Sequence, residues 1–236
     1  MRRFAEIDST SSYLLAQARS GTPEGLVAVA DVQRAGRGRL DRTWVSPPGA
    51  SLLASILLRP CLAPDSLHLA LAAVALAAAD ACADVAGARP GLKWPNDLVL
   101  GAGDAKVAGI LAEAQPPALV AGIGINVDWP PGTLPAGAAA LGPVDRDELL
   151  AALLRHLGDR YGDWPRVREE YRSACVTVGR RVRVDLGNEI LTGTATGISD
   201  EGHLVVLPIA GAGGTAHART VAAGDVVHLR PAVPPA

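Results

Sequence analysis

Residues 92–126 read LKWPNDLVLGAGDAKVAGILAEAQPPALVAGIGIN, and this stretch decides the fold. Leu92–Trp94 and Leu98–Leu100 flank Pro95-Asn96-Asp97, the turn at 101–104 leads into a run at 106–114, and a further apolar run follows at 118–125. Pro, Asn, Asp and Gly, the residues typical of turns, separate these runs. The pattern predicts a β-hairpin followed by a further strand that ends in Gly-Ile-Gly-Ile-Asn.

Helices and strands are also expected on both sides of this stretch. Leu26–Ala30 and Ser51–Leu58 are apolar runs of strand length. Helical patterns follow the Asp8–Ser12 capping cluster and run from Asp65 or Ser66 to Gly87, over Asp145–Tyr161 and over Pro165–Ala174. The order predicts an α+β domain in which helices pack on a mixed sheet.

The pattern changes after Gly179 to short alternating runs. These predict five strands of a small β-barrel, at Arg181–Leu186, Thr192–Ile198, Leu204–Leu207, Ala216–Val221 and Val226–Leu229. We therefore expect two domains, residues 1–176 and residues 177–236.

Composition narrows the class of protein. The chain has 236 residues and a net charge of -2, which gives no general attraction to nucleic acid or to an anionic membrane. Its longest apolar run, Leu69–Ala79, is short for a bilayer span, so we expect a buried helix and no membrane partner. Cys61, Cys82 and Cys175 form no Cys-x-x-Cys pair, which favours a reducing, cytoplasmic location and no protein-held metal.

The long segment between the first two predicted strands contains Gln33-Arg34-Ala35-Gly36-Arg37-Gly38-Arg39. Arg37 and Arg39 can bind an anion, and the glycines allow backbone N–H groups to approach it. A solvated basic loop is the alternative. The P-loop pattern is absent from the sequence, and the Gly-Ile-Gly-Ile-Asn segment lacks the third glycine of GxGxxG.

Lys93 and Lys106 are the only lysines among the 22 basic residues. Lysine is a compact ammonium that can follow a moving negative charge, whereas arginine is a rigid fork. Asp97 and Lys106 fall on opposite arms of the predicted hairpin, where they could meet and position an anionic substrate or a metal-bound phosphate. Asn126 is expected to be an exposed polar tip after a buried strand. Turn formation is the alternative explanation for Asn126 and for Pro95-Asn96-Asp97.

Taken in order, these segments resemble the biotin protein ligase family. The matching motifs are Asp8-Ser9-Thr10, Gln33–Arg39, Lys93–Asp97, Lys106–Leu111, Gly122–Asn126 and Gly224-Asp225-Val226-Val227. The resemblance implies ATP-dependent activation of biotin to biotinyl-5'-AMP, with Mg²⁺ delivered on ATP. Transfer to a lysine of a biotin carboxyl carrier domain of an acyl-CoA carboxylase then follows. It also implies a class II aminoacyl-tRNA synthetase-like catalytic domain and an SH3-like C-terminal barrel.

The same resemblance assigns roles to residues. Those implied for biotin are Ser9, Thr10, Ser11, Gln33, Arg37, Gly38, Arg39, Lys106, Gly109, Gly122 and Gly124. Those implied for the nucleotide are Arg37, Arg39, Lys93 and Asn126, and those implied for catalysis are Arg37, Arg39, Lys93, Asp97 and Lys106. The sequence departs from the family twice: Ser11 replaces the usual Asn, and the turn between Asp97 and Lys106 is about two residues longer.

Three other interpretations remain open from the sequence. A lipoate or octanoyl ligase resembles the same fold. A biotin-sensing repressor would carry an N-terminal helix-turn-helix, for which the residues before Ser9 leave no room, so we expect the monofunctional type. Finally, Arg180, Arg181 and Arg183 could form a docking strip on the barrel, although a charged edge strand is the simpler explanation.

Overall fold

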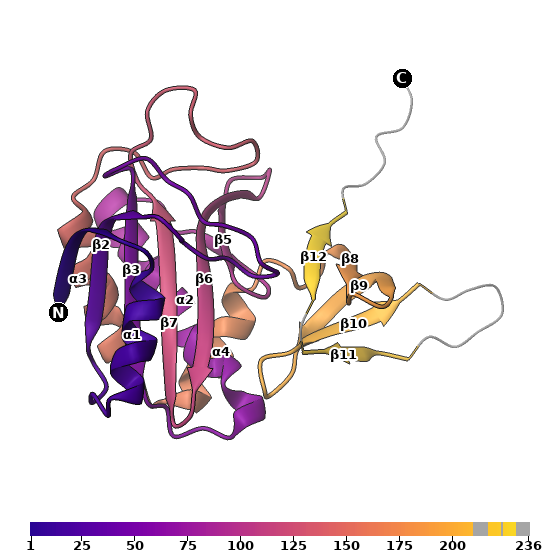
Figure 1. Ribbon diagram of the computed structural model, residues 1–236. Coiled ribbons are helices and arrows are strands. Elements are labelled where there is room, and N and C mark those ends of the chain that lie inside the picture. The colour runs from indigo at the N-terminus through magenta and orange to yellow at the C-terminus, as the bar shows by residue number, and fades with distance from the viewer. Residues whose placement is uncertain (210–216, 223, 230–236) are drawn as a thin grey trace.

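Two β-sheets organise the protein (Figure 1). The computed structural model describes residues 1–209, 217–222 and 224–229. The large sheet has the order β1-β2-β3-β7-β6-β5-β4 and comprises β1 (Arg2–Ile7), β2 (Val27–Gln33), β3 (Ser51–Leu58), β4 (Gly91–Lys93), β5 (Asp97–Leu100), β6 (Ala105–Gln115) and β7 (Ala118–Asn126). It is mixed, because β1 and β2 are parallel and the other pairs are antiparallel.

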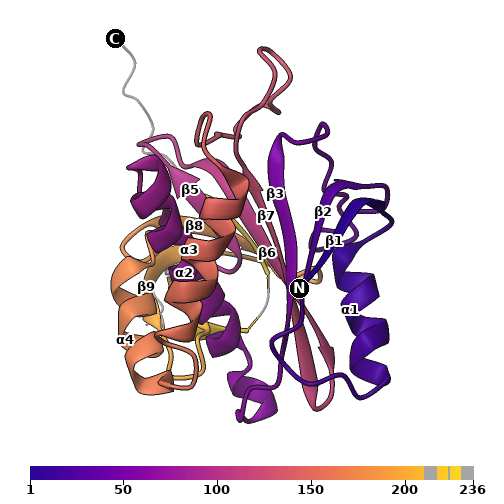
Figure 2. The same cartoon turned by 90° about the vertical axis from the view of Figure 1, so that its left-hand side faces the viewer.

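Helices cover both faces of the large sheet. They are α1 (Thr10–Arg19), α2 (His68–Ala86), α3 (Arg146–Gly158) and α4 (Trp164–Ala174). Figure 2 shows α1 on one side and the other three on the opposite side. All eight residues of β3 are buried, which explains why the sequence of this strand is a continuous apolar run and not an alternation. The predicted mixed sheet with packed helices is confirmed.

The small sheet is antiparallel and has the order β11-β10-β9-β8-β12. Its strands are β8 (Arg181–Asp185), β9 (Ile190–Ile198), β10 (Leu204–Pro208), β11 (Arg219–Val221) and β12 (Asp225–His228). Each overlaps a predicted strand. Ala216, where one strand was expected to begin, lies outside the described residues, as do residues 230–236 of the predicted second domain.

The alanine-rich helix is a core element. By length and composition the segment Pro64–Ala86 could cross a membrane, but 67% of its most apolar window is buried inside the molecule. A short 3₁₀ turn, Pro64–Ser66, precedes α2, and Gly87 ends it in the left-handed conformation with φ 67°.

Two local expectations need correction. Strand β1 was not predicted, because most of its residues are exposed and RRFAEI shows neither an apolar run nor a clean alternation. The predicted hairpin is a three-stranded unit, since β4 pairs with β5 through the Trp94–Asn96 turn before β5 pairs with β6.

A largely buried arginine joins three helical segments. The side chain of Arg160 is only 6% exposed, and its guanidinium binds Asp80 of α2 at 2.6 Å and Glu170 of α4 at 3.2 Å. It also donates to the carbonyl of His156 in α3. One turn further along α2, Asp84 binds Arg155, whose side chain is 56% exposed.

This difference predicts unequal costs for two matched substitutions. Asp80→Ala should lower the free energy of unfolding by about 3 kcal/mol, because it leaves a buried guanidinium partly unpaired. Asp84→Ala should cost less than about 1 kcal/mol, because Asp84 and its charged partner Arg155 are both about half exposed to solvent. Urea unfolding of both variants measures the difference, and equal costs would contradict it.

Candidate active site

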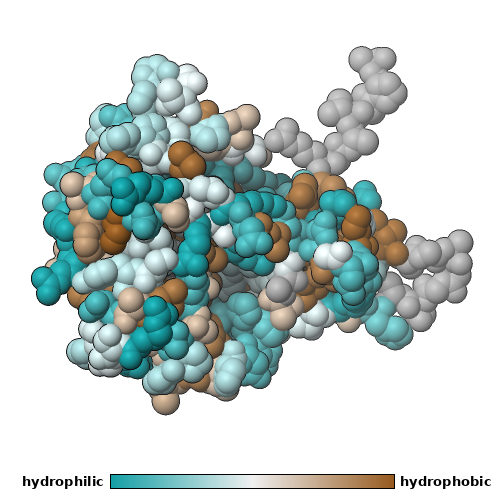
Figure 3. Space-filling view, in the orientation of Figure 1, coloured by the Kyte–Doolittle hydropathy of each residue, from teal (hydrophilic) through white to brown (hydrophobic). Residues whose placement is uncertain are grey.

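The centre of the site is a cavity of about 150 Å³ on the α1 face of the large sheet. Its walls come from the start of α1, the 34–50 loop, β3, β6 and β7, with Asp225 from the small sheet. Figure 3 shows the surface hollowed between the large body and the small sheet. The predicted site residues that line the cavity are Ser9, Thr10, Ser11, Gln33, Arg37, Gly38, Arg39, Asp97, Lys106, Gly109, Gly122 and Gly124.

One end of the cavity is formed by hydroxyl groups. Thr10 donates its backbone N–H to Gln33 Oε1 at 2.8 Å and its hydroxyl to the same oxygen at 3.0 Å. The hydroxyl proton of Thr10 is already donated to Gln33, so in its 2.7 Å contact with Ser55 the Thr10 oxygen must accept. Ser55 is therefore the donor to Thr10, and Ser11 must donate to Ser55 over 2.9 Å. This directed chain leaves lone pairs on Ser11 Oγ and both N–H donors on Gln33 Nε2.

Ser9 has a structural role at the start of α1. It is the N-cap of α1, and its side chain accepts a hydrogen bond from the backbone N–H of Ser12 at 3.3 Å. This cap fixes the helix start, which in turn places Thr10 and Ser11 in the cavity wall.

Glycines form the floor. Gly109 of β6 lies directly opposite Gly124 of β7. A Cβ atom on Gly124 would lie 2.5 Å from the Trp44 ring, and one on Gly122 would lie 2.6 Å from Ser11 Oγ. Only glycine therefore allows Trp44 and Ser11 to approach this strip of the sheet.

The other end of the cavity is charged. Lys106 Nζ lies 2.7 Å from Asp97 Oδ1 and 5.5 Å from the centre of the Trp44 ring. Lys106 is not paired with Asp97 in the sheet register, because Asp97 is opposite Gly109 and Lys106 is opposite Val99, with a register shift between Leu98 and Val99. The prediction that this acid and ammonium meet is confirmed.

The arginine loop closes one side of the cavity. Arg37 donates to Glu113 at 2.8 Å and to Ser12 at 3.1 Å. Arg39 donates to Asn96 Oδ1 at 3.3 Å and to the Gly224 carbonyl at 3.2 Å. Burial lowers the pKa of Arg39, while Asp225 and Asp97 oppose this effect. Arginine nevertheless stays protonated in proteins, so the guanidinium is a cation.

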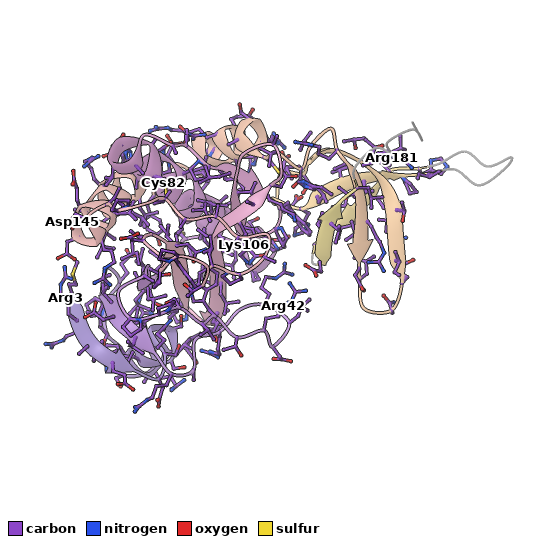
Figure 4. All side chains as sticks on the ribbon, turned by 90° about the horizontal axis from the view of Figure 1, so that it is seen from above. Arg3, Arg42, Cys82, Lys106, Asp145 and Arg181 are labelled. Carbon is purple, nitrogen blue, oxygen red and sulfur yellow. The ribbon has the colours of Figure 1, made fainter. Side chains whose placement is uncertain are left out.

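Arg42 extends the same loop toward the small sheet. Its guanidinium forms an ion pair with Asp225 of β12, and this hydrogen bond raises the pKa of Arg42. Figure 4 shows Arg42 and Lys106 on the side of the large sheet that faces the small domain. The loop is thus attached to the small sheet at two points, Gly224 and Asp225.

Two predicted site residues lie outside this cavity. Lys93 lines a separate cleft with Asp104, Arg180 and His228. Asn126 was expected to be an exposed tip, and this is wrong, since it is only 3% exposed. Its amide donates to the Ala139 carbonyl at 3.0 Å, which attaches the 129–143 loop to the sheet.

The sequence did not single out Trp44 or Ser55. Ser55 is fully buried in the middle of a strand whose neighbouring residues are apolar, and this was a usable signal, because a buried hydroxyl needs hydrogen-bond partners. Trp44 gave no comparable signal in its Pro- and Gly-rich loop. Within the described residues, its buried indole Nε1 has no hydrogen-bond partner.

Comparison with known proteins agrees with this geometry. Residues 4–129 match the model of the biotin/lipoate A/B protein ligase family, and residues 177–229 match the biotin protein ligase C-terminal domain. The biotin–acetyl-CoA-carboxylase ligase of Mycobacterium tuberculosis is 38% identical, over 96% of this chain and 88% of the relative. The enzyme of the same name from Paracoccus denitrificans is 34% identical, over 88% of this chain and 94% of the relative.

A solved structure gives the same result. The biotin protein ligase of Aquifex aeolicus in complex with biotin and ATP superposes with a TM-score of 0.79 at 27% identity, over 97% of this chain and 98% of that chain. With both domain models matched and these relatives aligned along nearly their whole lengths, the chain belongs to the biotin/lipoate A/B protein ligase family.

Proposed function

We propose that this chain is an ATP-dependent biotin ligase, which joins biotin to AMP and passes the biotinyl group to a lysine of a carrier domain. The observation that carries the proposal is one cavity with a hydroxyl end and a cationic end. A biotin molecule has a cyclic urea at one end and a carboxylate at the other. The two ends of the cavity complement these groups.

The hydroxyl end supports a urea in preference to an alkyl chain. A cyclic urea offers two N–H donors and one carbonyl acceptor. The directed hydroxyl chain presents acceptor lone pairs at Ser11, and Gln33 Nε2 presents donors. Octanoate would leave these buried groups without partners, which costs binding free energy. The geometry therefore favours biotin over octanoate.

The charged end fits the adenylation step. A carboxylate oxygen of biotin forms a bond to the α-phosphorus of ATP, and the bond from that phosphorus to the bridging oxygen breaks, releasing pyrophosphate. Lys106 and Arg39 would stabilise the negative charge that builds up between the two anions. Asp97 supplies a carboxylate beside Lys106 that could meet the Mg²⁺ arriving with ATP.

Transfer completes the reaction. The neutral amine of the carrier lysine attacks the carbonyl of the mixed anhydride, a C–N bond forms, and the bond from that carbonyl carbon to the phosphate oxygen breaks. AMP leaves with the electron pair, and the nitrogen loses a proton to solvent. Water would destroy the anhydride, so the site needs a cover until the carrier arrives. The 34–50 loop, attached to the small sheet through Arg39 and Arg42, is suited to this task.

Several finer assignments are part of the proposal. They are the division between residues 176 and 177, the likeness of the first domain to class II aminoacyl-tRNA synthetases, the SH3-like nature of the second, the cytoplasmic location and an acyl-CoA carboxylase as the source of the carrier. We assign Lys93 and Asn126 supporting roles, because neither lines the cavity.

The function is tested by supplying the protein with ATP, Mg²⁺, a biotin carboxyl carrier domain and either biotin or octanoate. Biotin should appear on the carrier lysine and octanoate should not, by intact-mass measurement. A carrier with its target lysine changed to arginine serves as the control. Transfer of octanoate alone would overturn the assignment.

Lys106→Arg should reduce adenylation by about 10²-fold, because it moves the positive charge away from the position that stabilises the transition state. The larger, planar guanidinium cannot place its charge where Nζ lies, 2.7 Å from Asp97 Oδ1 and 5.5 Å from the centre of the Trp44 ring. Biotin-dependent exchange of pyrophosphate into ATP measures the loss, and calorimetry should show that biotin still binds. Near-normal exchange would contradict the role of Lys106.

Ser55→Ala should raise the KM for biotin about 10- to 100-fold, because it breaks the hydroxyl chain at its middle and leaves buried groups unpaired. The kcat should change much less, because Ser55 is at the urea end. Ser51→Ala is the matched control, since Ser51 is equally buried on β3 but does not line the cavity. Similar KM values for the two variants would disprove the assignment.

A further inference from the structure

One buried histidine connects segments from both sheets. His228, the last residue of β12, has a side chain that is 7% exposed. Its Nδ1 lies 2.9 Å from Asp104 Oδ2 in the β5–β6 turn, and its Nε2 lies 3.0 Å from Thr177 Oγ1. Thr177 is fully buried and accepts the backbone N–H of Trp94 at 3.0 Å.

The protons in this network can be assigned. An ionised carboxylate only accepts, so Nδ1 must carry the proton that reaches Asp104. In neutral imidazole Nε2 then accepts, so the Thr177 hydroxyl donates to it while its oxygen accepts from Trp94. Each of these groups is satisfied only when His228 is neutral.

Each connected segment also carries part of the cavity wall. Trp94 leads into Asn96 and Asp97, and Asp104 lies two residues before Lys106. Strand β12 begins with Asp225, the partner of Arg42. Asp104 has φ 52°, a left-handed conformation that aspartate tolerates.

We propose that Asp104, His228 and Thr177 form an interdomain clasp, whose three residues are positioning residues for adenylation. The clasp fixes the positions of the Trp94–Asp97 segment, Lys106 and β12 relative to one another. It rests on the proposed function, because the step that it aligns is the attack of biotin on ATP. None of the three residues lines the cavity itself.

Protonation should open the clasp. Protonation of His228 would place a hydrogen on Nε2, directed at the Thr177 hydroxyl. Nε2 could then no longer accept the hydrogen bond that Thr177 donates. Burial lowers the pKa of His228; Asp104 opposes this effect, whereas Lys93 and Arg180, the other charged groups facing it, add to it. Cys175, next to Thr177, stays a neutral thiol because burial raises its pKa.

The direction of the pH dependence follows from linkage. The folded pKa of His228 lies below its ordinary value of about 6.5. The stabilisation that neutral His228 gives to the folded state is therefore complete above about pH 6.5 and is lost as the pH falls through the folded pKa. The kcat of adenylation should fall over the same acid range.

The first test compares two substitutions of Thr177 in the full chain. Thr177→Val keeps the shape but removes the hydroxyl, whereas Thr177→Ser keeps the hydroxyl. In biotin-dependent pyrophosphate exchange, Val should lower kcat about tenfold with little change in the KM for biotin, and Ser should restore it. A wild-type kcat in a folded Thr177→Val variant, with folding checked by thermal unfolding, would overturn the proposal.

The second test does not depend on a buried substitution. Asp104→Asn removes a charge that raises the pKa of His228, so the acid limb of kcat should move to lower pH. NMR titration should show the same shift for the His228 ring, whose signal is identified by its loss in His228→Gln. A shifted NMR titration with an unshifted acid limb would refute the clasp.

The two hypotheses can fail separately. If wild-type protein neither exchanges pyrophosphate nor labels a carrier, the proposed ligase function fails. The clasp is then judged by NMR alone: Thr177→Val should raise the pKa of His228, because it removes a hydrogen bond that favours the neutral ring. An unchanged pKa in that variant would reject the clasp on its own.

Discussion

The site depends on a strip of sheet that carries no side chains. Gly109 and Gly124 face each other on β6 and β7, and Gly122 lies two residues before Gly124 on β7. A sheet face in a protein core is normally filled by side chains at native density. Here the strip is open, so Trp44 from the loop and Ser11 from α1 can approach the backbone. The cavity exists because these three positions lack a Cβ.

The surrounding charges depend on contacts between distant segments. Lys106 is held between Asp97 and Trp44, and Arg39 is held between Asn96 and Gly224. None of these arrangements is stable alone, since an ordered arginine or lysine loses much side-chain freedom. Two anchoring contacts for each cation, which for Arg39 include one beside the small sheet, offset that cost and keep the cations in place before a substrate binds. Preorganised charge of this kind is effective in catalysis.

The small sheet is therefore part of the site. Asp225 contributes to the cavity wall and pairs with Arg42, while His228 at the other end of β12 reaches Asp104 and Thr177. A short strand thus contacts the arginine loop, the β5–β6 turn and the connection that follows α4. Movement of the small sheet would alter all three contacts together, which gives the cavity a direct mechanical connection to the second domain.

The sequence alone determined most of the architecture. Continuous apolar runs located β3 and β7, the Gly and Asp turns separated the other strands, and the ordered motifs predicted the residues that line the cavity. It failed for β1, whose exposed residues carry no apolar period, and for Asn126, where a polar residue after a strand was expected to be exposed. Only the tertiary structure decided that Trp44 and Ser55 line the cavity, that Lys93 faces another cleft and that His228 joins the two sheets. The physical reason is that periodicity reports which face of an element is buried, whereas the partner of a buried polar group comes from elsewhere in the chain and is fixed only by packing.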